Sequence, residues 1–315
     1  MPVNLGSKKY IRKDVHFGDR FFRRILKILS IGLLGLLFSI SLFLLAGAWP
    51  AIKEFGPSFL VSTTWDPVKE NFGALPVIFG TLLSSLIALI LAGPISVGIA
   101  LFLNELAPKK IADTVSFFIE MLASIPSVVY GLWGIFVLAP WLRTTVEPFL
   151  GSTLGFIPLF QGPPYGVGIL AAGIVLAIMI TPTVSAISRE VFRAVPQNYR
   201  EAALALGGTR SETMFLAVLK TAKNGVFGAL TLGLGRALGE TMAVTMVIGN
   251  RNEIAASLFA PGQTMASIIA NEYSEASTDL HLASLTAIGF CLLIVTLIVN
   301  GTARFIVWSN EKRWK

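Results

Sequence analysis

The chain has 315 residues, of which 54% are hydrophobic and only 14% are charged, and its mean hydropathy is +0.73. Soluble domains carry about 25% charged residues, whereas several apolar runs here reach the length of about 20 residues that crosses a bilayer. This composition excludes an ordinary soluble protein and predicts an integral, multi-pass membrane protein. The net charge of +7 is assigned to membrane topology, so no nucleic-acid partner is expected.

Polar connections separate six apolar segments that are predicted to span the membrane. Gly93-Pro94 is expected to kink or split the second segment, and Pro126 to bend the third. Residues 143–165 are rich in Gly and Pro and are expected to form a loop. The fold class is therefore an all-α membrane protein with six transmembrane helices. The segments cover about residues 28–49, 75–103, 115–142, 165–187, 225–249 and 282–308.

Basic residues indicate which side of the membrane each connection faces. Twenty of the 25 lysines and arginines lie in the N-terminal segment, in residues 104–113 and 188–223, and at the C-terminal end. Four lie in the other connections, and Arg236 lies within a span. Because basic residues concentrate on the cytoplasmic side, this distribution predicts that both termini are cytoplasmic.

Enzymatic machinery is largely missing from the sequence. His16 and His281 are the only histidines, and neither has partners spaced as in a metal site or a catalytic triad. The sequence contains no GxxxxGK[ST] phosphate-binding loop, so ATP is not expected to bind in that way. We therefore predict no catalytic residue, no metal and no cofactor on this chain, and a membrane-embedded enzyme is the least favoured function. Cys291 is interpreted as a small packing residue.

Two charges within the fifth apolar segment are the main functional signal. Arg236 lies about twelve residues, or roughly 18 Å, into this segment, near the middle of a hydrocarbon core of about 30 Å. A charge there costs at least about 2.5–3.5 kcal/mol and must face protein or water. Glu240 is expected to share a helix face with Arg236 at the i,i+4 spacing.

Two interpretations of these charges stay open. In the first, an Arg236–Glu240 ion pair only fixes helix packing. In the second, the two residues line a polar path, because the planar fork of arginine suits an oxyanion such as phosphate. Gly235 and Gly239 are interpreted as a small-residue face that allows close helix contact. Hydroxyl donors along such a path are expected from Ser124, Ser127, Thr181, Thr183 and Thr241.

A short polar helix is predicted in the 188–223 connection. Pro196 precedes the run YREAALAL, and Gly207-Gly208 ends it. The residues alone are equally compatible with a solvated connector and with a surface that another protein binds.

Glu201, Ala202, Ala203 and Gly207 match the Glu-Ala-Ala-x-x-x-Gly motif of bacterial ABC importer permeases, in which this helix docks into the ATPase. The Ile-x-Leu-Pro element that often follows in that family lacks its proline here, where residues 217–220 read AVLK. Residues 125–132 (IPSVVYGL) and 233–244 (GLGRALGETMAV) resemble the PstC-type permeases of bacterial phosphate importers. The resemblance covers most of residues 70–309.

The resemblance implies the type I ABC importer permease fold in the bacterial cytoplasmic (inner) membrane. Residues 73–309 would form the permease core, residues 1–72 the basic N-terminus, first helix and extracytoplasmic connection, and residues 310–315 a cytoplasmic tail. The implied partners, besides membrane lipid, are a second permease (PstA-like), two ATPase subunits that bind ATP and Mg, and an extracytoplasmic phosphate-binding protein. The 51–72 and 250–281 connections would face that binding protein.

The implied function is ATP-driven import of inorganic phosphate by alternating access. A permease for another oxyanion, such as sulfate or molybdate, is the nearest alternative, and a stand-alone ion-coupled transporter or channel is a further one. The expected substrate-path residues are Arg236, Glu240, Thr241 and Ser127, and the expected ATPase-coupling residues are Glu201, Ala202, Ala203 and Gly207.

Overall fold

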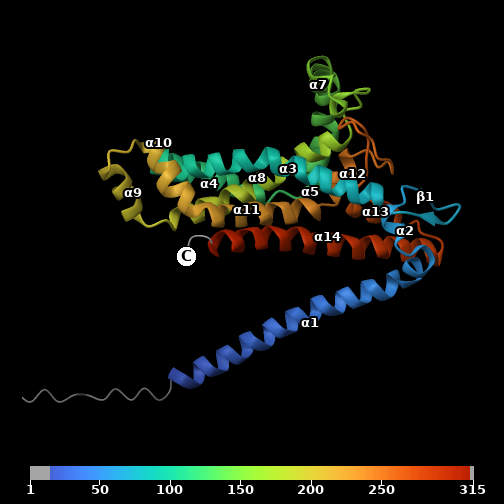
Figure 1. Cartoon of the computed structure of the whole chain (residues 1–315), viewed down its shortest axis with the longest axis horizontal. Coiled ribbons are helices and arrows are strands. Elements are labelled where there is room, and N and C mark those ends of the chain that lie inside the picture. Colours follow the sequence, from blue (N-terminus) through green and yellow to red (C-terminus); the bar gives the residue numbers. More distant parts are fainter. Residues whose placement is uncertain (1–14, 313–315) are drawn as a thin grey trace, which may run out of the picture. The chain divides into compact units, whose positions relative to one another are not determined.

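The computed structural model describes residues 15–312 and is predominantly helical (Figure 1). It divides into two compact units, one up to Ala46 and one from Gly47 onward. In the first unit, α1 (Val15–Phe55) presents exposed apolar side chains such as Phe43. In the second unit its last turns are buried at Ala48 and Ala51. The helix is longer than the predicted span of 28–49, and Pro50 lies inside it.

The predicted 51–72 connection is ordered rather than a plain loop. It contains α2 (Ser58–Val61) and an antiparallel pair of short strands, β1 (Trp65–Asp66) and β2 (Asn71–Phe72), with Trp65 opposite Phe72. The indole N–H of Trp65 donates to Glu272 Oε2 at 2.8 Å, and His281 Nε2 lies 3.1 Å from the same oxygen. The ring of Phe72 stacks on His281. These contacts hold the hairpin against α13 (Met265–Glu272) and the start of α14 (Asp279–Lys312).

The second apolar segment forms α3 (Leu75–Leu101), followed by a π-helical turn, η1 (Phe102–Leu106). Gly93-Pro94 does not split it, because one missing N–H interrupts a single hydrogen bond while the helix packs along its length against its neighbours. Ser96 Oγ donates to the Thr181 carbonyl of α8 at 3.3 Å. Of the predicted kink or split, the split is therefore wrong.

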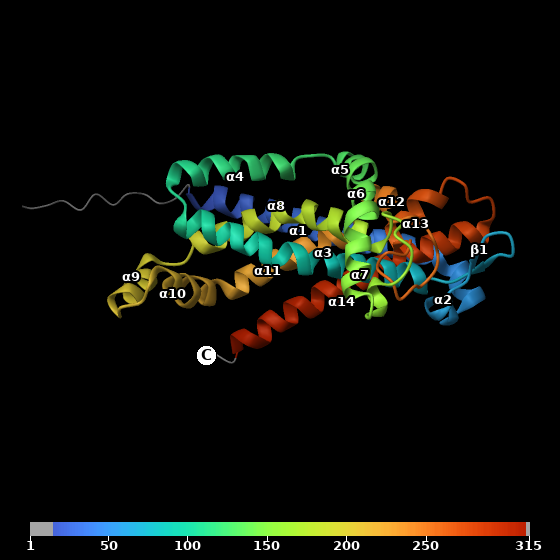
Figure 2. The ribbon, with the colours of Figure 1, turned by 90° about the horizontal axis from the view of Figure 1, so that it is seen from above.

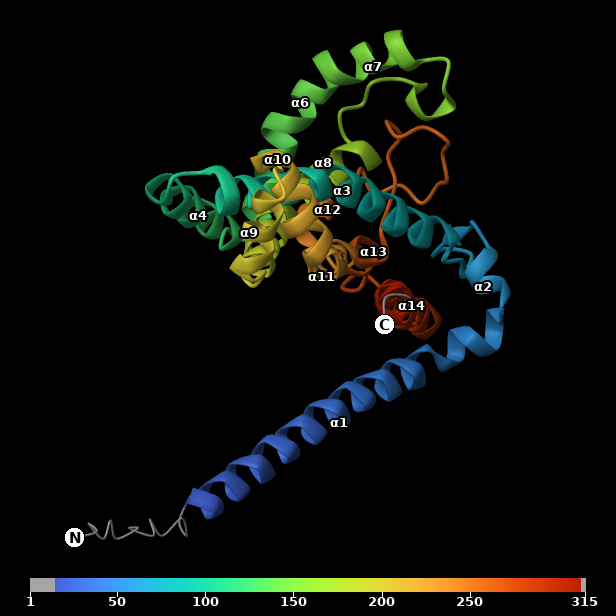
Figure 3. The same cartoon turned by 60° about the vertical axis from the view of Figure 1, so that its left-hand side comes forward.

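The third segment differs from the prediction of 115–142 at both ends. A first helix, α4 (Lys109–Ala123), ends before Pro126, which lacks an N–H and disfavours helical geometry at the preceding residue. A second helical stretch starts at Ser127 and extends to Leu154, so the first half of the predicted 143–165 loop is helical. Its parts are α5 (Ser127–Trp133), η2 (Gly134–Leu138), α6 (Ala139–Trp141), η3 (Leu142–Val146) and α7 (Glu147–Leu154), followed by η4 (Pro158–Phe160). Figure 3 shows α6 and α7 pointing away from α3 and α8.

The remaining helices follow in one run along the chain. The predicted fifth span of 225–249 is interrupted, because α11 ends at Leu238 and α12 begins at Met242. Part of the predicted 250–281 connection is core rather than surface, since Met265 and Ile268 of α13 are fully buried. The bounds are α8 (Ile169–Arg193), α9 (Gln197–Ala205), α10 (Arg210–Glu212), η5 (Thr213–Leu219), α11 (Lys220–Leu238) and α12 (Met242–Val247).

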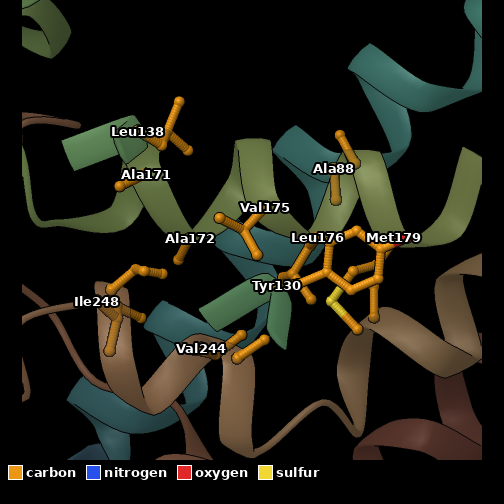
Figure 4. Packing of buried hydrophobic residues seen from close by; sticks show 14 of the residues in the cluster. Ala88, Tyr130, Leu138, Ala171, Ala172, Val175, Leu176, Met179, Val244 and Ile248 are labelled. Carbon is orange, nitrogen blue, oxygen red and sulfur yellow. The ribbon is translucent and has the colours of Figure 1, made fainter. Parts of the chain in front are cut away.

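Helix α8 is the central element of the second unit. It packs against α3, α4 and α11, and its buried residues include Val175, Leu176 and Met179, which Figure 4 shows facing Tyr130 and Val244. Backbone carbonyls cap its start, because the N–H groups of residues 168–170 donate to the carbonyls of residues 247, 260 and 258. The main core therefore forms where α8 meets the end of α11 and the broken third and fifth segments.

Five helical stretches are long and apolar enough to cross a membrane among the residues that the structure describes. They are Asp19–Phe55, Leu75–Leu106, Ser127–Leu154, Ile169–Arg193 and Asp279–Phe305. The predicted fifth span is not among these five. It corresponds to α11, which carries three basic residues, and to α12, which has only 6 residues.

Two glycines of α3 offer a matched test of this packing. A Cβ on Gly80 would lie 2.1 Å from the Gln263 carbonyl oxygen, whereas a Cβ on Gly98 would meet nothing within 4 Å. Gly80→Ala should destabilise the protein by about 1–3 kcal/mol through overpacking, and Gly98→Ala should leave its stability unchanged or slightly higher. Thermal unfolding in detergent measures both, and equal melting temperatures for the two variants would contradict the close approach.

Candidate functional site

Arg236 lies in the last turn of α11, beside the break in the fifth segment. Its Nη1 donates to Thr183 Oγ1 on α8 at 3.0 Å. The guanidinium has five N–H donors, and this is its one hydrogen bond among the described residues. None of its nitrogens belongs to the buried polar atoms that lack a partner. The other donors therefore face accessible space rather than the packed core.

Glu240 does not share a helix face with Arg236. The helix ends at Leu238 with Gly239 as its C-cap, so the i,i+4 relationship is lost. Glu240 Oε1 instead accepts the Ala243 N–H at 3.3 Å, in the first turn of α12. Within residues 15–312 no ion pair joins Arg236 to Glu240. The predicted shared helix face is therefore wrong, and the interpretation as an internal ion pair has no contact to support it. Gly239, at the break, has a φ of −96°, which causes no backbone strain. Glycine disfavours a continuing helix because it loses more conformational freedom than other residues do.

The predicted hydroxyls have different partners. Ser124 and Thr181 donate to carbonyls of their own helical segments at 2.7 Å. Thr241 precedes α12, and its hydroxyl donates to the Gly239 carbonyl at 3.4 Å, while Ser127 begins α5. Thr183 alone among the five contacts Arg236. The structure thus singles out Thr183, one residue after Pro182, as the partner of the arginine.

The two sequence motifs around Arg236 pack against each other. A Cβ on Gly131 of α5 would lie 2.6 Å from Met246 Sδ and 3.1 Å from Ala243 Cα of α12. Tyr130 belongs to the same core cluster as Ala237 and Val244. Residues 125–132 and 233–244 therefore form one packed unit around the arginine.

The close helix contact predicted for Gly235 and Gly239 is made by Gly233 instead. A Cβ on Gly233 would lie 2.5 Å from Val184 Cγ2 of α8. A Cβ on Gly235 would be at an ordinary distance of 3.6 Å from Asn300 of α14, and one on Gly239 would meet only its own segment. Gly233 is thus the residue that lets α11 approach α8.

The predicted polar helix is α9, and it ends at the predicted glycine. Gly207 has a φ of +84°, the left-handed geometry typical of a helix stop, and the Gly208 N–H donates to the Ala203 carbonyl at 3.1 Å. Glu201 and Ala202 are exposed, and Leu206 has 89% of its surface exposed. Figure 1 places α9 and α10 at the end of the second unit opposite β1 and α13. The helix therefore presents polar and apolar residues together on an open surface.

Arg200 anchors α9, and the sequence analysis did not identify it. Its Nη2 donates to Glu105 Oε1 at 2.8 Å and to the Phe192 carbonyl at 2.9 Å, and its Nη1 donates to the Val195 carbonyl at 2.6 Å. Both side chains are largely buried, with 14% and 12% exposed. The two carbonyls lie at and just beyond the end of α8, where helix carbonyls lack partners within the helix. One guanidinium thus ties α9 to the ends of both α3 and α8.

Arg189 lies in the predicted 188–223 connection, but in the structure it is buried within α8. Its Nη1 donates to Ser116 Oγ, and its Nη2 lies 3.7 Å from Asp113 Oδ1, both on α4. The contacts hold α4 against α8.

A capping box follows α9 and starts the helix that leads to Arg236. The Thr209 N–H and hydroxyl donate to Glu212 Oε2 at 2.7 and 2.8 Å, and the Glu212 N–H donates back to Thr209 Oγ1 at 3.3 Å. These hydrogen bonds, the backbone one first, hold the pKa of the Glu212 carboxyl below its ordinary value. The link between α9 and α11 is consequently a defined turn.

Known proteins resemble this chain over most of its length. The phosphate transport system permease protein PstC from Mesorhizobium japonicum is 44% identical to it, over 99% of this chain and 97% of that protein. The PstC from Pasteurella multocida is also 44% identical, over 96% of this chain and 95% of that protein. The PstC of Xylella fastidiosa strain 9a5c is 46% identical, over 94% of this chain and 92% of the relative.

Solved structures share the fold. A chain of the inward-facing MetNI methionine ABC transporter matches with a TM-score of 0.55 and 17% identity, covering 74% of this chain and 94% of that chain. A chain of a bacterial ABC transporter involved in the import of alginate matches with a TM-score of 0.58 and 15% identity, over 92% and 99%. The family model described as "Binding-protein-dependent transport system inner membrane component" matches residues 94–308. With this match and these relatives, the chain belongs to the family of inner membrane components of binding-protein-dependent transport systems.

Proposed function

We propose that this chain is the membrane permease subunit of an ATP-driven importer of inorganic phosphate. The relatives that match nearly its whole length are phosphate transport system permeases. The observation that carries the proposal is Arg236, a permanent cation at a helix break, held by one hydrogen bond to Thr183. Its other donors face accessible space and suit the oxygens of a phosphate ion.

The proposed transport cycle depends on partners. An extracytoplasmic binding protein delivers phosphate, a second permease of similar fold completes the path, and two ATPase subunits bind ATP and Mg, while this chain binds no cofactor. The chain crosses the bacterial cytoplasmic membrane six times, with α11 and α12 as the broken fifth crossing and both termini in the cytoplasm. ATP binding moves α9, and alternating access follows.

Arg236 is proposed to hold phosphate only briefly, because a tight site would prevent release. Thr183 keeps the guanidinium oriented, and Glu240, Thr241 and Ser127 line the path beside it. Glu201, Ala202, Ala203 and Gly207 form the surface that docks into the ATPase. An anion competition assay distinguishes phosphate from sulfate or molybdate, and co-purification of an ATPase distinguishes the importer from a stand-alone transporter or channel.

Arg236→Gln should reduce phosphate uptake by at least about tenfold while the complex still assembles, because hydrogen bonds from a charged donor contribute about 1.5–3 kcal/mol. Uptake of radiolabelled phosphate by cells with the intact system measures the effect. Arg193→Gln is the matched control, since that arginine is exposed and pairs with Glu190. Normal uptake by the Arg236 variant would remove this residue from the path.

Glu201→Lys should weaken ATPase association and reduce uptake, since it reverses a charge on the exposed face of α9. Glu190→Lys, at another exposed glutamate that pairs with Arg193, should have little effect. Affinity purification through a tag on this chain, with the ATPase quantified by immunoblot, compares the two. Equal ATPase recovery and uptake in both variants would contradict the docking assignment.

Glu105→Gln should uncouple ATP hydrolysis from transport, because it removes the charge that anchors Arg200. Breaking a buried ion pair costs about 3–5 kcal/mol when one charge is left uncompensated, so folding must be monitored as well. The measurement is the ratio of phosphate transported to ATP hydrolysed in proteoliposomes. The double variant Glu105→Arg, Arg200→Glu should recover part of that ratio, and a ratio unchanged in Glu105→Gln would refute the role of the pair.

A further inference from the structure

A groove of about 740 Å³ lies between α11 and α14. At about 30 Å³ per molecule it has room for roughly 25 waters. One wall is made by small residues of α11 and leaves the backbone open, since a Cβ on Gly228 would meet nothing within 4 Å. Figure 2 shows α14 separating from α11 toward its C-terminal end. The residues that line the groove are Ile187, Gly225, Gly228, Ala229, Thr231, Leu232, Gly235, Thr296, Asn300 and Arg304.

The groove begins one helical turn from the Arg236–Thr183 contact. Ile187 follows Thr183 by four residues on α8, and Leu232 precedes Arg236 by four residues on α11. Residues four apart in a helix lie on one face. Going from Thr183 to Ile187 leads along α8 toward α9. Going from Arg236 back to Leu232 leads along α11 toward α10. Both directions therefore lead to the same end of the second unit. The groove therefore extends from the arginine toward the α9 end.

Polar residues form a line along the α14 wall. Thr296, Asn300 and Arg304 are spaced four residues apart and share one face of a helix that is otherwise strongly apolar. Asn300 Oδ1 is buried and has no hydrogen-bond partner among the described residues. A buried polar atom without a partner is unfavourable unless water or a ligand satisfies it. The line ends at Arg304, which is exposed near the end of α14.

We propose that this groove is the exit path along which a small hydrated oxyanion leaves Arg236 for the cytoplasm, with Asn300 and Arg304 as stepping positions. The inference rests on the proposed function and adds the route and its residues. The polar line on α14 suits a hydrated oxyanion better than a lipid tail. Water carried by the ion, or a phosphate O–H, can donate to Asn300 Oδ1, and the negative charge matches Arg304, whereas a hydrocarbon chain can do neither. Each position contributes one or two polar contacts, which suits transit rather than tight binding.

Two glycine variants test whether the groove must stay open. Gly228→Leu places a side chain in the groove, while Gly301→Leu places one in open space on α14 outside its lining. Gly228→Leu should reduce phosphate uptake at least tenfold with normal complex assembly, and Gly301→Leu should leave uptake within twofold of the unaltered protein. Equal uptake by the two variants overturns the exit path.

Thiol labelling tests what occupies the groove. In a Cys291→Ala background, which removes the only native cysteine, the Asn300→Cys variant is exposed in inverted membrane vesicles to an anionic, membrane-impermeant thiosulfonate. Labelling should be rapid, and 10 mM phosphate, chosen as roughly saturating for a weak anion site, should slow it severalfold. Thr302→Cys, on another face of α14, should show no protection by phosphate.

The outcomes distinguish a failure of the exit path from a failure of the proposed function. Labelling only by a membrane-permeant maleimide, with no effect of phosphate, would show a lipid-filled groove and overturn the exit path. If the unaltered system imports phosphate and the groove variants behave like their controls, the exit path fails while the proposed function stands. If the unaltered system takes up a different oxyanion, and that ion protects the Asn300→Cys variant, the phosphate assignment fails and the groove stands.

Discussion

A guanidinium cannot escape the membrane interior by losing its proton, and the structure around Arg236 follows from that constraint. The arginine lies where α11 stops, so the chain does not enclose it within a continuous apolar helix. Thr183 supplies one acceptor, and the other donors remain accessible. Next to this end of α11, Gly131 lets α5 approach α12, and Gly233 lets α11 approach α8. The charge is thus supported on one side by packing and left open on the other.

Helix α8 links this charge to the surface of α9. It carries Thr183 next to Arg236, Arg189 against α4, and the Phe192 carbonyl that accepts from Arg200. Arg200 in turn reaches Glu105 just beyond α3. A displacement of α9 would therefore act on the ends of α3 and α8 through one buried, multiply bonded side chain. In the proposed importer this is the route by which a surface event reaches the substrate path. Only residues 194–196 separate α8 from α9, and the Val195 carbonyl among them is bound by Arg200.

The opposite end of the second unit is organised by aromatic and carboxylate contacts. Trp65, Phe72 and His281 pack together, and Glu272 joins the first and last of them through one oxygen. This cluster orders the 51–72 connection, which composition alone described only as polar. It leaves exposed acidic residues such as Glu70 and Glu275 around a rigid base. A rigid base is what a surface needs if it is to receive a separate binding protein, as the proposed function requires.

Composition and local pattern were sufficient for several conclusions. Apolar length decides that the chain spans a membrane, because no soluble fold could bury such segments, and a glycine after EAALAL stops a helix wherever the helix lies. Those features depend on residues close in the sequence.

The sequence also showed that Arg236 and Glu240 lie in an apolar segment, but it did not show how they are related in space. The i,i+4 argument assumes a continuous helix, and the helix ends between them. Tertiary structure alone decided that Arg236 meets Thr183, 53 residues away, and that Arg200 meets Glu105, 95 residues away. Such pairs form because α8 brings distant segments together, and a charge in a polar segment carries no local mark of the partner that will bury it.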